Sequence, residues 1–309
     1  REWADGVAIT DVTVRPQVQP EKSLTAFVEV TNMTAAVFRG EVKAKVEGEQ
    51  WNVLGSVELK PGEGKVVELR KKFPEAHLWS PADTYLYNMT ASIRSDGFRD
   101  ACVVPFGFRE IRWKGGHRFF MNGHPITLRR TNSDYDCVKN HELRLRQMKT
   151  FRSRGITSYR IWTPSDLEVF ADICDREGML IATCFNTGWG AAYKTEEFWP
   201  RYERALRKMI RSLKNHPSVI CWGVSNEFGG IYGGRLPDGS YSERAMQHQA
   251  EIGDRLLELD PTRPWEAYGE MEGRPQGEMT PEGLSGKGPM PLRSLHYPSL
   301  GNEAPRGAR

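Results

Sequence analysis

Apolar and polar residues alternate over several short segments in the first hundred residues of the chain. Within 41–47, Val42, Ala44 and Val46 fall on one face, and charged residues occupy every position between them. A period of two is typical of a strand with one buried and one solvated face. About seven such segments, separated by turn residues, predict an antiparallel sandwich. They are 7–14, 24–31, 41–47, 51–59, 64–73, 85–93 and 101–106.

After Gly107 the pattern changes, and short apolar runs alternate with longer amphipathic segments. The longer segments place apolar residues three and four positions apart, which predicts helices, and Gly155 and Gly178 are typical of residues that end a helix. Repeated strand–helix units predict a (β/α) barrel over 107–309 with strands one to about six. Strands are expected at 126–130, 159–161, 179–184, 219–224, 265–268 and 295–297, and helices at 140–154, 165–178, 199–214 and 242–259.

The composition is that of an ordinary globular protein, with 39% apolar and 27% charged residues. A formal net charge of only +3, with scattered basic residues, gives no reason to expect nucleic acid or a membrane surface as a partner. We find no membrane-spanning run and no signal segment in this sequence, so the localisation stays unknown. Five widely spaced cysteines, no His-x-x-x-His pair and no calcium loop predict neither a metal nor a cofactor.

A predicted buried strand that ends on an acid is the strongest sign of chemistry. The apolar run 219–224 leads into Asn226 and Glu227, residue types that strands disfavour and that are costly to bury unpaired. The pattern indicates a strand that delivers a carboxylate into a cleft. The alternative is that Glu227 merely begins a solvated loop, and the dipeptide alone does not separate the two interpretations.

Six motifs follow one another along the chain. They are Leu-Trp-Ser-Pro at 78–81, Phe-Gly-Phe-Arg-Glu-Ile at 106–111, Phe-Met-Asn-Gly-His-Pro-Ile at 120–126, Phe-Ala-Asp-Ile-Cys-Asp-Arg-Glu-Gly at 170–178, Asn-His-Pro-Ser-Val-Ile-Cys-Trp-Gly-Val-Ser-Asn-Glu at 215–227 and Asp-Pro-Thr-Arg-Pro at 260–264. Together they resemble glycoside hydrolase family 2, which includes β-galactosidases, β-glucuronidases, β-mannosidases and exo-β-glucosaminidases. The resemblance implies an immunoglobulin-like β-sandwich over 1–106 and a catalytic (β/α)8 TIM barrel over 107–309.

By that resemblance Glu227 is the general acid/base and Asn226 hydrogen-bonds the 2-substituent of the sugar. Burial beside Trp222 and Phe228 would favour the protonated acid that leaving-group departure needs. The retaining mechanism also needs a second carboxylate about 5 Å away, which the family supplies on strand seven. The stretch 122–309 is shorter than the about 250 residues of a full barrel, so we expect an incomplete barrel without its nucleophile. The sequence is therefore expected to be an internal fragment that is inactive alone.

Three further polar residues match substrate-binding positions of the family. Arg160 ends the predicted second strand, and its alternative role is a surface ion pair. Asn132 and Asp136 follow the first strand, where Arg130 and Asp134 replace a glycine and a histidine of the family pattern. The substrate contacts of that loop therefore depart from the family.

Four aromatic and imidazole side chains complete the expected substrate site. Trp162 and Trp189 suit stacking on a sugar ring, and packing inside the barrel is an equal alternative. His296 and Tyr297, on the presumed sixth strand, match the place of a group that hydrogen-bonds the nucleophile.

Three functions are consistent with this sequence. The first is a retaining β-glycosidase that acts on terminal β-linked sugars, and the second is a non-catalytic carbohydrate-binding or scaffold relic of such an enzyme. The third is a sandwich adhesion module with an unrelated α/β appendage, which Asn226 and Glu227 disfavour. A carbohydrate is the expected partner. A homo-oligomer is also expected, because an incomplete barrel leaves strand edges open to pairing.

Overall fold

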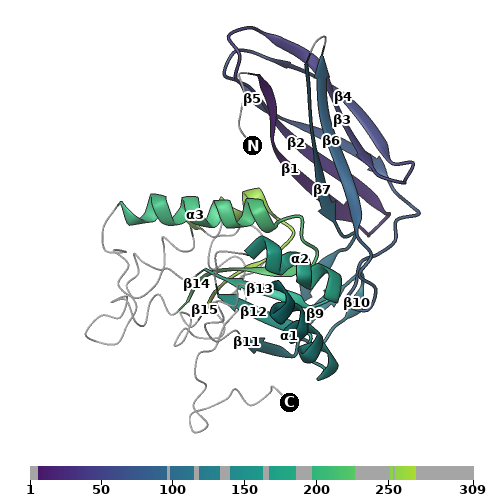
Figure 1. Cartoon of the computed structure of the whole chain (residues 1–309), viewed down its shortest axis with the longest axis vertical. Helices are drawn as coiled ribbons and strands as arrows, with labels where there is room; N and C mark the ends of the chain where they lie inside the picture. Colours follow the sequence, from purple (N-terminus) through teal and green to yellow (C-terminus); the bar gives the residue numbers. More distant parts are fainter. Residues whose placement is uncertain are drawn as a thin grey trace.

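The computed structural model describes residues 6–95, 98–114, 118–132, 140–162, 167–185, 197–226, 251–252 and 255–268. Within these ranges the chain forms an all-β part and a part in which helices cover a parallel sheet (Figure 1). No helix among these residues is long and apolar enough to cross a membrane.

Seven strands form two antiparallel sheets that pack face to face. The three-stranded sheet has the order β1-β2-β5, and the four-stranded sheet has the order β4-β3-β6-β7. Each strand buries alternate side chains in a shared core, as period-two patterning requires; in β3, for example, Val42, Ala44 and Val46 are all buried. The seven predicted strands are therefore confirmed. Their bounds are β1 Val7–Gln17, β2 Ser23–Asn32, β3 Phe38–Val46, β4 Asn52–Leu59, β5 Gly64–Lys72, β6 Tyr87–Ser95 and β7 Phe98–Phe106.

Five parallel strands in sequential order form the second part, with helices between them. The order β11-β12-β13-β14-β15 is that of consecutive βα units in a barrel wall. The strands are β11 Arg130–Asn132, β12 Ser158–Trp162, β13 Leu180–Cys184, β14 Val219–Asn226 and β15 Trp265–Tyr268, and the helices are α1 His141–Ser153, α2 Leu167–Glu177 and α3 Phe198–Leu213.

Local capping explains where the first two helices begin and end. The Asn140 side chain accepts hydrogen bonds from the backbone amides of Glu142 and Leu143, which caps α1. Gly155 follows α1 with φ +76° and Gly178 follows α2 with φ +70°, a left-handed conformation that glycine adopts without strain. The glycine stops predicted from the sequence are therefore confirmed.

A small antiparallel sheet between the two parts was not predicted. It consists of β8 Ile111–Lys114, β9 Arg118–Met121 and β10 His124–Pro125. Phe119 and Met121 pack against Leu180, Ala182 and neighbouring residues of the parallel sheet in a core cluster separate from the one beneath the helices. The sheet therefore covers the first residues of β13 and β14 on the face of the parallel strands that the helices leave open.

The structure shifts one predicted strand and leaves others outside the described residues. The strand expected at 126–130 is wrong in its position, because β11 begins at Arg130. Backbone pairing starts there since the Arg129 carbonyl accepts from the amides of Thr157 and Ser158, just before β12. The predicted strand 295–297 and most of the predicted helix 242–259 lie outside the described residues.

Candidate active site

The strand β14 ends at Asn226, where the sequence predicts the catalytic pair. It is buried from Val219 to Val224 and hydrogen-bonded between β13 and β15. Near its end, the Tyr202 hydroxyl of α3 donates to the Val224 carbonyl. Glu227, the next residue, lies outside the described residues, as does the side chain of Asn226.

Arg160 is buried on β12 and faces away from the helices. Its neighbours Tyr159 and Ile161 pack in the core beneath the helices, so strand alternation turns Arg160 towards the opposite face. It is 8% exposed, and its Nη2 donates to the Cys184 Sγ of β13 at 3.1 Å. The expected alternative, a surface ion pair, does not fit this burial.

Three predicted positions lie at the carboxyl ends of neighbouring or nearby strands. Asn132 ends β11 in register with Arg160, and Trp162 ends β12 in register with Cys184. Asn226 likewise ends β14, so the three backbone positions lie at the same end of the parallel sheet, where its strands finish. The side chains at these three positions lie outside the described part of the structure. The same holds for four further predicted residues, Asp136, Trp189, His296 and Tyr297, in their entirety.

The loop before β14 is held against the sandwich by its first two residues. The Asn215 side chain accepts from the Val14 amide and donates to the Val12 carbonyl, both at 2.8 Å, so it pairs with β1 as another strand would. Lys214, which is buried, forms an ion pair with Asp11. The sandwich therefore fixes the start of the strand that leads to Asn226.

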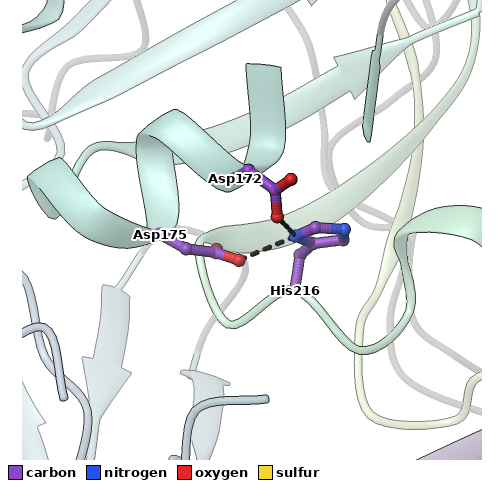
Figure 2. A group of neighbouring side chains, drawn as sticks. All are labelled: Asp172, Asp175 and His216. Atoms are coloured by element: carbon purple, nitrogen blue, oxygen red, sulfur yellow. Dashed lines mark hydrogen bonds and ion pairs between the residues drawn. The ribbon is translucent and has the colours of Figure 1, made fainter. Parts of the chain in front are cut away.

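His216, the next residue of this loop, is held by two carboxylates of α2 (Figure 2). Its Nδ1 lies 2.7 Å from Asp175 Oδ2 and 3.9 Å from Asp172 Oδ1. Burial lowers the pKa of His216, but the hydrogen bond to Asp175 and the charges of both carboxylates outweigh it and raise that pKa. The other oxygen of Asp175 accepts from the Ser218 amide at 2.9 Å.

These three side chains are close enough to hold a metal ion, since their ligand atoms lie within 4.8 Å of one another. However, both oxygens of Asp175 and the His216 Nδ1 already take part in hydrogen bonds. The group therefore acts as a brace between α2 and the start of β14. Sequence spacing did not indicate it, because its members lie on elements about forty residues apart.

Two buried arginines bind backbone carbonyls of the same loop and of the first residue of β14. Arg109 donates to the carbonyls of Pro217 and Val219, and Arg263 donates to the carbonyls of Val219 and His216. Burial, together with the charge of Arg263, holds the pKa of Arg109 well below its usual range. Both motifs, 106–111 and 260–264, thus converge on the residues that precede β14.

Asp260 balances one of these arginines. Its Oδ2 accepts from Arg263 at 2.5 Å and from the Trp222 indole at 3.0 Å, and Oδ1 accepts from Thr262. Burial alone would raise the pKa of Asp260, but the charge of Arg263 and the Thr262 hydrogen bonds lower it. Trp222 therefore points into the core beneath the helices and towards Asp260. That it lies beside Glu227 stays a prediction, because Glu227 lies outside the described residues.

Comparisons with known proteins lead to the same family that the sequence motifs resemble. The family model described as glycosyl hydrolases family 2 matches residues 7–109, and the model of the family 2 TIM barrel domain matches residues 116–274. A beta-glucuronidase of Paenibacillus borealis is 22% identical over 84% of this chain and 43% of its own length. A putative beta-glucuronidase of Formosa agariphila is 28% identical over 60% of this chain and 20% of its own.

Solved structures share the fold. A GH2 beta-galacturonidase from Eisenbergiella tayi, solved with galacturonate bound, superposes with a TM-score of 0.75 at 23% identity, over 86% of this chain and 47% of its own. A Bacteroides uniformis beta-glucuronidase gives a TM-score of 0.67 at 24% identity, over 86% of this chain and 33% of its own. The chain thus spans less than half the length of each of these relatives.

Proposed function

Because this chain belongs to family 2 of the glycosyl hydrolases, we propose that it carries part of the active site of a retaining β-glycosidase, with Glu227 as general acid/base. The observation that carries the proposal is the placement of Asn226 at the carboxyl end of the buried strand β14, directly before Glu227. Active sites of (β/α) barrels lie at this end of the strands.

Each predicted residue has a role in this proposal. Glu227 protonates the leaving oxygen, and Asn226 hydrogen-bonds the 2-substituent of the sugar. Arg160 supplies a buried positive charge within the barrel wall, which stabilises a neighbouring carboxylate in its ionised form. The remaining positions, at which we propose contacts with the sugar or with the nucleophile, are Asn132, Asp136, Trp162, Trp189, His296 and Tyr297.

The substrate is proposed to be a terminal β-linked sugar. Relatives named as glucuronidases and a galacturonidase favour an acidic sugar in the cleft, with neutral β-galactosides and β-mannosides as the competing class. We also propose that the sandwich comprises 1–106 and the barrel part 107–309. Trp79 follows the sandwich strand β5 and packs with β9 and β13, and its indole donates to the Asp175 carbonyl of α2.

The nucleophile is not assigned to any residue of this chain. A lone general acid accelerates cleavage by roughly 10² to 10⁴-fold, far less than glycoside hydrolysis needs. We therefore expect residues 1–309 alone to hydrolyse no glycoside and to bind sugars no more tightly than about millimolar. We also expect the isolated chain to form a homo-oligomer, which sedimentation measures directly.

A panel of aryl glycosides tests the proposal. The isolated chain is incubated with the β-glucuronide, β-galacturonide, β-galactoside, β-mannoside and β-glucosaminide, and the whole protein that contains it is assayed in parallel. We expect turnover of one substrate by the whole protein only. If residues 1–309 hydrolyse a substrate and Glu227→Ala abolishes this turnover, the claim that they lack the nucleophile is overturned. If neither the isolated chain nor the whole protein hydrolyses any substrate, the non-catalytic relic is favoured.

A further inference from the structure

A cleft lies between the sandwich and the end of the parallel sheet that is opposite to the candidate active site. Its volume is about 780 Å³, which is within the range of small-molecule sites. The outer face of the β1-β2-β5 sheet forms one wall, and the segments 214–217 and 260–264 form the other. These segments precede β14 and β15, whereas the candidate active site lies where the strands end. The cleft is therefore distinct from that site.

Cross-strand pairs place two arginines on the sheet wall. Arg15 of β1 and Arg70 of β5 are both in register with Thr25 of β2, so the three residues form one row across the sheet. The adjacent row is formed by Thr13, Phe27 and Glu68. Side chains of both rows project from the same face of the sheet, and all six line the cleft.

Arg15 is held in place with its hydrogen-bonding groups available. Its guanidinium carbon lies 4.6 Å from the centre of the Phe27 ring, a stacking contact that fixes the side chain. Within the described part of the chain, Arg15 donates no hydrogen bond to protein. Arg70 uses one N–H, which it donates to Gln17 Oε1 at 3.2 Å. Most donors of both guanidinium groups are thus free to bind a ligand.

The acids that line the cleft offset its positive charge only in part, although Asp260 and Glu68 both act on Arg15 through their charges. Glu110 accepts from the backbone amides of Val18 and Gln19 and from Arg112, and Asp260 is engaged by Arg263, Thr262 and Trp222. Glu68 is exposed and makes no ion pair with another described residue. Meanwhile Arg109, on the barrel side, binds only carbonyl oxygens among its described partners. The cleft therefore carries an excess of positive charge.

We propose that this cleft binds a small molecule that bears an oxyanion, held between Arg15 and Arg70 across Thr25. A guanidinium offers paired N–H groups that match two oxygens of a carboxylate, sulfate or phosphate. The partial burial of Arg15 strengthens such an ion pair relative to one on the open surface. Glu68 opposes it, because its carboxylate lies in the neighbouring row.

Titration calorimetry on the 309-residue chain at constant ionic strength tests this proposal. Glucuronate, inorganic sulfate and inorganic phosphate are the probes, which separate a sugar carboxylate from a free anion, and glucose is the neutral counterpart of glucuronate. The variants are Arg15→Gln, Arg70→Gln and Glu68→Gln. Arg94→Gln is the matched control, because Arg94 is an exposed arginine on the other sheet, paired with Glu41.

We expect at least one oxyanion to bind and glucose not to compete with it. Arg15→Gln and Arg70→Gln each weaken binding about 10- to 100-fold, Glu68→Gln tightens it, and Arg94→Gln leaves it unchanged. Arg70 is exposed, so Arg70→Gln keeps the test valid even if Arg15→Gln disturbs the fold. The proposal is overturned if no probe binds at about 10 mM, or if binding survives both arginine substitutions, which would place the ligand elsewhere, including the candidate active site.

Discussion

Replacing Asp175 tests whether the brace on His216 holds β14 in place. In Asp175→Ala the Ser218 amide and the His216 Nδ1 lose their acceptor, while both remain buried. Each unsatisfied buried group costs about 1 to 3 kcal/mol, and breaking a buried ion pair from one side costs about 3 to 5 kcal/mol. We therefore expect Asp175→Ala to lower the free energy of unfolding by about 3 to 5 kcal/mol.

Asp172→Ala is the matched control for this change. Asp172 lies on the same helix and receives the same substitution, but its side chain is 50% exposed and 3.9 Å from the His216 Nδ1. Exposed pairs contribute about 0 to 1 kcal/mol, so this variant should remain close to the wild type. Urea unfolding, followed by tryptophan fluorescence, measures the free energy of unfolding of both variants.

The pH dependence gives the same experiment a second readout. The pKa of His216 is raised in the folded state, so its contribution to stability is complete below its unfolded value of about 6.5 and is lost as pH rises through the folded value. Burial and the charge of Arg263 oppose the rise in the pKa of His216, whereas Asp175 and Asp172 cause it. The wild type should thus lose stability as the pH rises above about 6.5, and Asp175→Ala should lose less. Equal costs for the two substitutions at about pH 6, with parallel pH profiles, would refute the brace.

Two further changes address the junction of the two parts. Asn215→Ala removes both hydrogen bonds to β1, so we expect a loss of about 1 to 3 kcal/mol and separate unfolding transitions of sandwich and barrel part in calorimetry; a single unshifted transition would contradict this. Gly178→Ala would place a Cβ 2.3 Å from the Pro81 carbonyl oxygen at φ +70°, whereas Gly48→Ala at φ +77° meets nothing within 4 Å. Gly178→Ala should therefore cost clearly more than the roughly 1 to 2 kcal/mol of left-handed strain alone, and equal costs in urea unfolding would show that the contact with Pro81 does not matter.

Local patterns predicted most of the fold, because its strands and helices bury one face each. Alternation located β1 to β7, and Gly155 and Gly178 located the ends of α1 and α2. The small sheet β8-β9-β10 escaped prediction, since its strands are at most four residues long and carry too few positions for a period. The order of the parallel strands followed from the sequence of βα units.

The candidate site was predicted less completely, and the reason is the distance between its parts in sequence. The end of β14 at Asn226 could be read from the apolar run before it. The supports of that strand could not, because Asn215 contacts β1 across 201 residues and Asp175 contacts His216 across 41.

The leaving-group dependence of a Glu227→Gln variant tests the central claim most directly. It is measured in the whole protein as kcat/KM for glycosides with good and poor leaving groups, with Glu303→Gln as control, since Glu303 follows an asparagine in the same way. If Glu227 is the general acid, turnover of glycosides with poor leaving groups falls by roughly 10² to 10⁴-fold, while activated aryl glycosides lose much less because they need little protonation. An equal loss for both classes, or no loss for either, would contradict that role.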